Sequence, residues 1–505
     1  MKPTDPIHTP DAPLPAPNQS YLVKTLGCKA NLYDSQQLEA QLQLRGWKSQ
    51  GSKREGHLES PNLCIVNSCS VTDEADKQSR KLAAKLAKEN PNATIVMTGC
   101  GAEIDPMLMA KSPGIHYVVG NRDKPGLINE VLSAQALDPR PAQGKVLGVA
   151  APYEELLSRH PMDREWPVVE SAFLTPVMNL HAEEGRTRAF LKIQEGCNSF
   201  CTYCIIPYGR GPNRSLSIDH VVKQVQELVE QGTQEIVITG TNIGDYGLDF
   251  ESKPKSPQVT QLFKEIFQKT KLPRLRVSSL DPVEIDLELI ELMEKEPRFC
   301  PHFHVSLQSP HSKILKLMKR KYSAVEVEHC LNRIAEISKS RGTPFVGPFV
   351  GMDVITGFPG ETKEDFEWGV NALSQLPWTR LHVFPYSERV GTPATRLPKS
   401  VPQSERVSRA KILRDLSFER LLSAHQNILH HCKSREAPLT EILLESKTRG
   451  PDGSPEWHAG YTPNYLRVLV KASPKLKRNG LVSLMPYQIT VDRPSGDVAF
   501  LAAPV

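Results

Sequence analysis

Short apolar runs alternate with helical patterns along residues 21–135. Four runs end in a polar residue or glycine: YLVKTLG, NLCIVNS, ATIVMTG and HYVVG. Stretches with apolar residues at helical spacing follow them, such as VTDEADKQSRKLAAKLAKE. Because such runs are typical of buried strands, and strands that alternate with helices form parallel sheets, this region predicts an open parallel α/β sheet domain.

The same alternation resumes after a stretch that contains several prolines. Six β patterns, separated by helical stretches, lie at residues 188–194, 235–240, 274–279, 302–307, 349–357 and 380–386. Six βα units predict a partial (βα)6 barrel, and barrels of this kind carry their site at the carboxyl ends of the strands. We therefore expect chemistry-bearing residues directly after these runs.

The C-terminal part changes from this alternation to a β-rich pattern. A helical pattern covers residues 403–432, and three β-rich runs follow it: TEILLES, NYLRVLVKA and GLVSLMPYQITV. Glycine, proline and lysine separate the runs, which suits a small antiparallel β-barrel of the oligonucleotide-binding kind. The pattern by itself fits a small β-sandwich equally well.

These patterns divide the chain into six segments. Residues 1–18 hold six prolines, so we expect a disordered leader there. The predicted segments are 1–18 for the leader, 19–135 for the first α/β domain, 136–182 for a linker, 183–415 for the barrel core, 416–432 for a connecting helix and 433–500 for the β-module.

Composition places the chain among folded globular proteins. The 505 residues are 39% hydrophobic and 24% charged, which excludes collagen-like, coiled-coil and low-complexity classes. No run approaches the roughly 18 apolar residues of a membrane span, and the N-terminus lacks the apolar centre of a signal peptide. We therefore expect a cytoplasmic protein without a membrane partner.

Three cysteines form a CxxxCxxC pattern directly after the first barrel strand. Cys197, Cys201 and Cys204 stand in the sequence EGCNSFCTYC. Three thiolates on one short loop can bind three irons of a [4Fe-4S] cluster, which leaves the fourth iron open because no fourth cysteine lies nearby. Buried structural cysteines or a zinc knuckle are the alternatives, although structural zinc sites favour CxxC pairs and a fourth ligand.

Three further cysteines stand at strand ends of the first domain. Cys28 ends the first strand pattern, Cys69 the second and Cys100 the third. Ligands of open α/β sheets gather beyond the carboxyl ends of strands, so these cysteines predict a second site with three thiolates. Taken singly, each would more often be a small buried side chain. We keep that structural interpretation for the remaining cysteines, Cys64, Cys300, Cys330 and Cys432.

The CxxxCxxC loop after strand one of a partial barrel resembles the radical S-adenosylmethionine (SAM) superfamily. The resemblance implies that the open iron binds the methionine end of SAM. It also implies that an electron from the cluster cleaves the sulfonium and releases a 5′-deoxyadenosyl radical. Polar groups at strand ends are then implied to hold SAM, and the candidates are Thr239, Asn242, Ser278 and Ser279.

Two cluster sites followed by a terminal β-module resemble the radical SAM methylthiotransferases over residues 20–495. The motifs that carry this resemblance are TLGCKANLYDS, NSCSVTDEADKQSR, MTGC, EGCNSFCTYCIIPYGRG, VITGTNIGDYG, HFHVSLQS, MDVITGFPGET and LHVFPYSERVGTPA. Several are most similar to the branch that acts on N6-threonylcarbamoyladenosine beside the anticodon of tRNA. Sister branches, which act on isopentenyladenosine or on a ribosomal protein aspartate, remain the alternatives.

The resemblance implies an enzyme that replaces the hydrogen on carbon 2 of this adenine by a methylthio group. It implies two [4Fe-4S] clusters, SAM, a reducing electron donor, a sulfur donor and a TRAM-like β-module that binds tRNA. The cluster of the first domain is implied to carry or supply the sulfur. The alternative of another class is a non-catalytic iron-sulfur protein that binds RNA and senses redox state, but such a sensor would need neither the barrel nor two clusters.

Three features depart from the family pattern. Pro310 stands where the family usually has glycine, and proline cannot adopt the positive φ that glycine allows. Residues 101–103 read Gly-Ala-Glu where an Ala-Gln pair is commoner, and residues 136–186 form a long linker. None of these departures removes a predicted cluster ligand.

Charge and aromatic residues suggest where tRNA would bind. The net charge is +5, and the whole excess lies within residues 401–505, which favours a polyanion partner or an ordinary solvated surface. Each candidate below has a structural alternative, a solvated face for the basic runs and a buried packing role for the tyrosines. The candidates are Lys319, Arg320, Lys321, Lys475, Lys477 and Arg478 for phosphates, Tyr461 and Tyr465 for stacking, and Arg210 and Arg214 for a phosphate or carboxylate.

Overall fold

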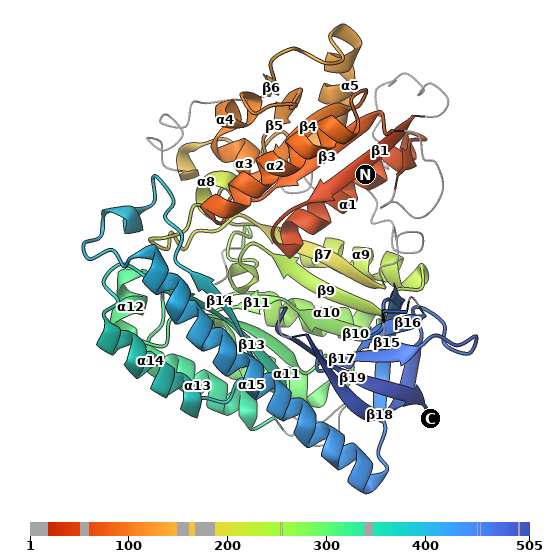
Figure 1. The fold of residues 1–505 in the computed structure, drawn as a ribbon, viewed down its shortest axis with the longest axis vertical. Helices are drawn as coiled ribbons and strands as arrows, with labels where there is room; N and C mark the ends of the chain where they lie inside the picture. Colours follow the sequence, from red (N-terminus) through yellow and green to blue (C-terminus); the bar gives the residue numbers. More distant parts are fainter. Residues whose placement is uncertain are drawn as a thin grey trace. The chain divides into compact units, whose positions relative to one another are not determined.

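The chain forms two units in a computed structural model (Figure 1). The first unit is Met1–Pro176 with Tyr208–Arg210, and the second is Val177–Pro207 with Gly211–Val505. The predicted leader at 1–18 and most of the predicted linker at 136–182 lie outside the described residues. The structure describes residues 19–50, 60–148, 161–166, 187–252, 254, 256–337, 347–451, 453–454, 456–492 and 495–505.

The first unit contains a six-stranded sheet in which every neighbouring pair is parallel, as the alternation predicts. Its order is β2-β1-β3-β4-β5-β6. The central strands β3 and β4 are buried along their whole length, because helices cover both faces of the sheet. The strands are β1 (Ser20–Thr25), β2 (Lys48–Ser49), β3 (Leu63–Ser68), β4 (Thr94–Gly99), β5 (Tyr117–Val119) and β6 (Lys145–Leu147).

Two differences from the predicted elements concern the ends of this sheet. Strand β6 falls inside the predicted linker, where a three-residue run is too short to give a period. The sequence pattern YDSQQLEAQLQLRG predicts a helix from Tyr33, but α1 begins four residues earlier, at Lys29, because the Asn31 amide donates to the Leu26 and Ser68 carbonyls and fixes a polar first turn. The helices are α1 (Lys29–Leu44), α2 (Asp73–Glu89), α3 (Cys100–Ile104), α4 (Pro106–Ala110) and α5 (Leu127–Leu137), with a 3-10 turn η1 (Lys124–Gly126).

The second unit contains all six predicted barrel strands. They form two sheets, β10-β9-β7-β8 and β11-β12-β13-β14, and consecutive β10 and β11 are separated only by Ser278. All pairs are parallel except β7 with the short β8. The strands are β7 (Arg188–Glu195), β8 (Arg214–Ser215), β9 (Glu235–Gly240), β10 (Arg274–Val277), β11 (Ser279–Leu280), β12 (His302–Gln308), β13 (Phe349–Thr356) and β14 (Arg380–Pro385).

Helices follow the barrel strands and bury their apolar faces. The last, α15 (Gln403–Arg435), is one continuous helix of 33 residues, so the predicted boundary between 415 and 416 falls inside it. No described helix combines the length and the apolar character that crossing a bilayer requires. The others are α8 (Ile206–Arg210), α9 (Ile218–Glu230), α10 (Val259–Lys269), α11 (Leu287–Lys295), α12 (Ser312–Leu317), α13 (Ala324–Ala335) and α14 (Lys363–Gln375), with 3-10 turns η4 (Ile243–Asp245), η5 (Pro282–Glu284) and η6 (Pro393–Arg396). A further 3-10 turn, η2 (Pro161–Asp163), precedes β7 and belongs to the first unit.

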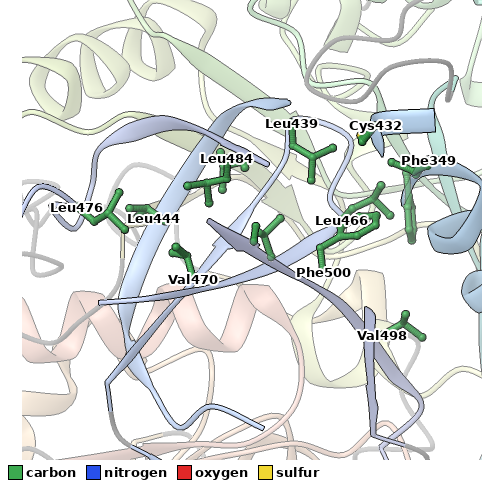
Figure 2. Close-up of a cluster of buried hydrophobic side chains, with 14 of the residues drawn as sticks. Phe349, Cys432, Leu439, Leu444, Leu466, Val470, Leu476, Leu484, Val498 and Phe500 are labelled. Atoms are coloured by element: carbon green, nitrogen blue, oxygen red, sulfur yellow. The ribbon is translucent and has the colours of Figure 1, made fainter. Parts of the chain in front are cut away.

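The C-terminal segment is a closed five-stranded barrel in the order β15-β16-β17-β19-β18. Its pairs are antiparallel except β17 with β19, which is parallel. Figure 2 shows Leu444, Val470, Leu484 and Phe500 gathered in its core, to which Cys432 of α15 adds. Because the five strands close into a ring, this segment is the predicted barrel and not a sandwich. The strands are β15 (Leu439–Thr448), β16 (Trp457–Tyr461), β17 (Arg467–Lys471), β18 (Leu481–Asp492) and β19 (Asp497–Pro504).

This barrel docks on the amino ends of β7, β9 and β10 through a buried ion cluster. Glu235 Oε2 lies 2.6 Å from Arg274 Nη2, and its other oxygen lies 2.8 Å from Arg276 Nε. Arg276 also donates to the Pro463 carbonyl of the barrel at 2.9 Å. Burial alone would raise the pKa of Glu235, but the two guanidinium groups outweigh it and bring the pKa to about 2.

Candidate active site

The CxxxCxxC loop connects β7 to α8 at the carboxyl end of the strand. Gly196 opens it with a φ of 76°, and a Cβ at this position would overlap the Pro212 carbonyl oxygen. Only glycine allows both the positive φ and the close approach. The turn at Gly196 therefore places Cys197 directly beyond the strand end, where the sequence predicted it.

The three thiols of the loop lie close enough to affect one another. Burial raises the pKa of Cys204 well above its usual range, and the thiols of Cys201 and Cys197 raise it further. The backbone N–H of Ser199 lies 3.4 Å from Cys197 Sγ. Buried, mutually repelling thiolates need a positive group to compensate them, and the irons of a [4Fe-4S] cluster supply it. These residues fit such a cluster.

Arg320 contacts this site, which corrects its predicted role as a phosphate ligand. Its Nη1 donates to Cys201 Sγ at 3.0 Å, and its Nε donates to the Tyr322 hydroxyl at 3.0 Å. Its remaining nitrogen pairs with Asp281, and only 8% of the side chain is exposed. A guanidinium with three buried partners is not available to RNA. It lies beside Cys201, a predicted cluster ligand, and donors to such a sulfur adjust the reduction potential of a cluster.

The two lysines beside Arg320 are more accessible. Lys319 is exposed, and Lys321 Nζ lies 3.3 Å from Asp245 Oδ1 with half of its side chain exposed.

Within the described ranges, no three His, Cys, Asp or Glu side chains are grouped closely enough to hold a single metal ion. A [4Fe-4S] cluster binds each thiolate to a different iron, so its ligands lie further apart.

The four predicted SAM contacts lie at the carboxyl ends of neighbouring strands. Thr239 is the penultimate residue of β9, and Asn242 follows that strand. Ser278 lies between β10 and β11 and Ser279 begins β11, and the Ser278 N–H donates to the Ile238 carbonyl at 3.0 Å. The Asn242 N–H donates to the Gln194 side chain of β7 at 2.8 Å. Contact of these residues with SAM stays a prediction.

The strand-end cysteines of the first unit also come together. Cys28 precedes α1, Cys69 follows β3 and Cys100 opens α3 directly after β4, and β1, β3 and β4 are neighbours in the sheet. Burial raises the pKa of Cys69 to about 12, with the Cys100 and Cys28 thiols contributing. A Cβ on Gly27 would lie 2.7 Å from Cys69 Sγ, so glycine permits this approach. The three residues fit a second cluster.

Arg210 belongs to the first unit and has structural partners there. Its Nη2 lies 3.2 Å from Asp34 Oδ2, which also lies 3.0 Å from Lys124 Nζ. Burial raises the pKa of Cys100, and the charge of Arg210 opposes this rise. The network favours the structural interpretation of Arg210, with a positive charge held near the cysteines. Arg214 begins β8, opposite Glu195 of β7.

The other candidates divide between buried and exposed positions. Tyr461 and Tyr465 stack on each other with ring centres 5.0 Å apart, and Arg188 lies over the Tyr461 ring at 4.6 Å. This packing favours their structural interpretation. Lys475 and Lys477 are exposed on the β17–β18 connection, whereas Arg478 is half-buried.

Pro310 packs against Gly369, which has no side chain to meet it. Cys64, Cys300, Cys330 and Cys432 are all buried, as their structural interpretation requires.

Polar residues on β12, β13 and β14 were not predicted as candidates. His304, Asp353 and His382 alternate with buried apolar residues along these strands. The signal was present in HFHVSLQ and RLHVFPY, where polar and apolar residues alternate with the period of a strand. These residues share one face of the sheet.

Comparisons with known proteins identify the family and the fold. Residues 191–370 match the family described as "Radical SAM superfamily", and residues 20–120 match "Uncharacterized protein family UPF0004". A radical SAM enzyme uses SAM and a [4Fe-4S] cluster. The structure is similar to that of the radical SAM methyltransferase TsrM from Kitasatospora setae with cobalamin and a [4Fe-4S] cluster bound. The TM-score is 0.50 and the identity 18%, over 75% of this chain and 77% of that one.

Two curated relatives span nearly the whole chain. Threonylcarbamoyladenosine tRNA methylthiotransferase MtaB of Bacillus subtilis is 34% identical over 453 residues, covering 89% of this chain and 90% of that protein. tRNA-2-methylthio-N(6)-dimethylallyladenosine synthase of Carboxydothermus hydrogenoformans is 29% identical over 441 residues, covering 85% and 89%. The chain is therefore an enzyme that belongs to the radical SAM methylthiotransferase family.

Proposed function

We propose that this enzyme adds a methylthio group to carbon 2 of N6-threonylcarbamoyladenosine next to the anticodon of tRNA, with a [4Fe-4S] cluster at each cysteine site. The observation that carries the proposal is the pair of three-thiol sites, one in each unit. The substrate rests on the motifs TLGCK and FPYSERVGTPA, and on 34% identity to a relative named for this nucleoside against 29% to one named for dimethylallyladenosine.

The chemistry explains why a protein would keep two such sites. Carbon 2 of adenine is neither acidic nor electrophilic, so acid and base side chains alone cannot exchange its hydrogen for sulfur. The bound cofactors supply the radical that removes this hydrogen and the sulfur that replaces it. In this division Cys197, Cys201 and Cys204 hold the SAM-binding cluster, with Arg320 fixing the Cys201 sulfur. Cys28, Cys69 and Cys100 hold the cluster that carries or supplies the sulfur.

The partners follow from the same proposal. They are tRNA, a reducing electron donor and a sulfur donor. Lys475 and Lys477, both exposed on the C-terminal barrel, are the basic residues that we expect to contact tRNA phosphates. Their replacement should weaken tRNA binding and flatten its dependence on salt, because each phosphate contact releases counterions.

The second candidate function is the sister reaction on tRNA that carries isopentenyladenosine (dimethylallyladenosine). The 29% identity to the dimethylallyladenosine synthase over most of the chain supports it. The two substrates differ in the group on N6, which is charged in one and apolar in the other. Separate reactions with the two substrates therefore distinguish the two proposals.

The test reconstitutes the full chain with iron and sulfide without oxygen. The enzyme then receives SAM, dithionite and tRNA with either N6-threonylcarbamoyladenosine or isopentenyladenosine, and nucleosides are analysed by mass spectrometry. We expect a methylthio mass gain on the threonylcarbamoyl nucleoside only. A methylthio mass gain on isopentenyladenosine alone would make that nucleoside the substrate instead. Formation of 5′-deoxyadenosine without a methylthio gain on either nucleoside would refute both tRNA substrates.

A further inference from the structure

Helix α2 of the first unit has a buried side and a basic side. It lies on one face of the first sheet (Figure 1), and its Ala83 and Leu86 are buried against apolar residues of β3 and β4. Because one helical turn takes about 3.6 residues, the opposite side of the helix includes positions 77, 81, 85 and 88. Lysine stands at all four positions and is exposed at each. We name these residues the α2 lysine row: Lys77, Lys81, Lys85 and Lys88.

The charges along this side of the helix have one sign. Residues 77–88 hold five Lys or Arg and neither Asp nor Glu. The carboxylates that the row does meet lie outside this stretch, one at each end. Asp73 Oδ2 lies 2.6 Å from Lys77 Nζ, and Glu89 Oε1 lies 3.8 Å from Lys85 Nζ. Exposed pairs of this kind are weak, so both lysines stay available to another anion.

The other two members of the row carry charge that no carboxylate compensates. Lys81 and Lys88 form no ion pair with any residue in the part of the chain that the structure describes. The helix dipole favours a cation at Lys88, which lies in the last turn. Lys81 stands four residues from Lys77 and four from Lys85, and like charges at this spacing destabilise a helix. Helix stability alone therefore does not explain the row.

The composition of the row favours a nucleic acid over a protein as its partner. Gln78 is the one exposed residue of 77–88 that is not a lysine, so no apolar or aromatic side chain is exposed among them. Protein interfaces have an apolar or aromatic centre and are depleted in lysine. Lysine binds phosphate as a point charge on a flexible stem. From Lys77 to Lys88 the helix rises about 16 Å, at about 1.5 Å per residue, which is long enough to meet several phosphates of one backbone.

We propose that the α2 lysine row binds the phosphate backbone of the substrate tRNA. The inference rests on the proposed function, in which the nucleoside receives its sulfur at the strand-end site of Cys28, Cys69 and Cys100. An anticodon arm whose nucleoside reacts there must pass close to the first unit. Helix α2 starts at Asp73, four residues after Cys69, and Lys77 lies about one turn from that start. The row is therefore close to the site that the nucleoside has to reach.

The test removes three charges of the row from the full, cluster-loaded chain. The variant combines Lys81→Gln, Lys85→Gln and Lys88→Gln, because glutamine forms helix about as well as lysine. Binding of tRNA is measured over a range of salt concentrations. We expect at least a tenfold weaker affinity at about 0.1 M salt. The slope of log affinity against log salt should fall in magnitude by about 2–2.7, since each phosphate contact contributes about 0.7–0.9.

Two comparisons distinguish phosphate binding from recognition of the base and from a change in net charge. Phosphate contacts carry no sequence information, so tRNA with N6-threonylcarbamoyladenosine and tRNA with plain adenosine should lose affinity equally. Arginine at the same three positions keeps the charge and should keep the wild-type affinity and slope. The matched control combines Lys295→Gln, Lys363→Gln and Lys411→Gln, which removes three charges from lysines of the second unit that are 74%, 77% and 76% exposed. It should leave the slope unchanged.

The outcomes separate this inference from the proposed function. If the wild-type enzyme forms the methylthio product but the triple variant of the row binds tRNA with wild-type affinity and slope, the inference is overturned alone. An equal loss in the matched control would also overturn it, because net charge would then explain the effect. If the wild-type enzyme neither binds tRNA nor forms product, the proposed function fails and the inference fails with it.

A protein partner would give a different result. If tRNA binding is unchanged and product falls only when an acidic one-electron flavoprotein replaces dithionite, the row binds that protein and the inference is overturned. Release of 5′-deoxyadenosine without RNA should stay at the wild-type rate in every variant, which checks that the chain folds and holds its loop cluster. If the triple variant fails to fold, Lys81→Gln alone carries the test, with a slope lowered by about 0.7–0.9.

Discussion

The two cysteine sites are built in different ways. Cys197, Cys201 and Cys204 come from one short loop, and a single turn at Gly196 places them. The first-unit cysteines lie up to 72 residues apart, and only the neighbouring order of β1, β3 and β4 brings their thiols together. The spacing of three cysteines along the chain determines the loop site, whereas the order of strands in the sheet determines the strand-end site. Different substitutions should therefore disrupt the two sites.

The largest expected effect comes from removing one ligand of the loop site. Cys201→Ala should abolish release of 5′-deoxyadenosine, lowering it at least a thousandfold to the background rate, because three thiolates are needed to hold the SAM-binding cluster. Cys300→Ala is the matched control, since Cys300 is buried in the same unit. Chromatography of reduced reactions measures both. If Cys201→Ala still released 5′-deoxyadenosine, the loop would not take part in this reaction.

A change in the first sheet should disturb only the strand-end site. Ile65 is fully buried in β3, and Ile65→Ala should cost about 2–4 kcal/mol of the free energy of unfolding of the first unit. We expect iron to leave this site at lower urea while 5′-deoxyadenosine release persists. Ile238→Ala, an equally buried change in β9, is the control. Equal iron loss from both sites in Ile65→Ala would contradict the separation.

Acid should weaken the second unit through Glu235. Its pKa is lowered from 4.5 to about 2 in the folded chain, so its ionised form stabilises the fold above pH 4.5. That stability is lost as the pH falls from 4.5 toward 2, and amounts to about 3 kcal/mol. Unfolding in urea at pH 5 and at pH 2.5 measures it. The loss of unfolding free energy between these two pH values should vanish in Glu235→Gln. It should persist in Glu288→Gln, which removes an exposed ion pair with Lys264.

The smallest effect concerns the reduction potentials of the two sites. Arg320 places a charged donor 3.0 Å from Cys201 Sγ, whereas Asn121 places a neutral one 3.5 Å from Cys100 Sγ. Arg320→Gln should lower the potential of the loop cluster by about 60 mV, the equivalent of one charged hydrogen bond of about 1.4 kcal/mol. Asn121→Ala should shift the potential of the cluster proposed at the strand-end site by less. Redox titration followed by electron paramagnetic resonance measures both, and equal shifts would contradict the difference in charge.

Most of the fold could be predicted because its strands are strongly patterned. The fully buried strands β3 and β4 appear in the sequence as short apolar runs. Both ends of the barrel strand β9 lie at the residues that the sequence predicted. Strands β2, β6, β8, β16 and β19 were not predicted. The first four have only two to five residues, which carry too little periodicity, whereas β19 has eight residues and was missed despite its length. The C-terminal barrel needed its closed pairing to be distinguished from a sandwich.

The candidate site was predictable where one residue type determines the chemistry. The spacing of Cys197, Cys201 and Cys204 indicated the loop site, and the strand-end positions of Cys28, Cys69 and Cys100 indicated the other, because few other roles place thiols together. Basic residues were less informative, since charge alone does not say whether a side chain meets solvent or a buried partner. Arg320 was expected at a phosphate, but Asp281 and Cys201 hold it inside the barrel unit. Its burial depends on contacts between segments more than 100 residues apart, which no local pattern encodes.

The central claim is that the two sites divide the reaction, and Cys69→Ala tests it most directly. The reconstituted variant receives SAM, dithionite and tRNA with N6-threonylcarbamoyladenosine, and both 5′-deoxyadenosine and the modified nucleoside are quantified by mass spectrometry. We predict that 5′-deoxyadenosine still forms while the methylthio product disappears. Methylthio product at the wild-type level from Cys69→Ala would contradict the division of the reaction between the loop site and the strand-end site.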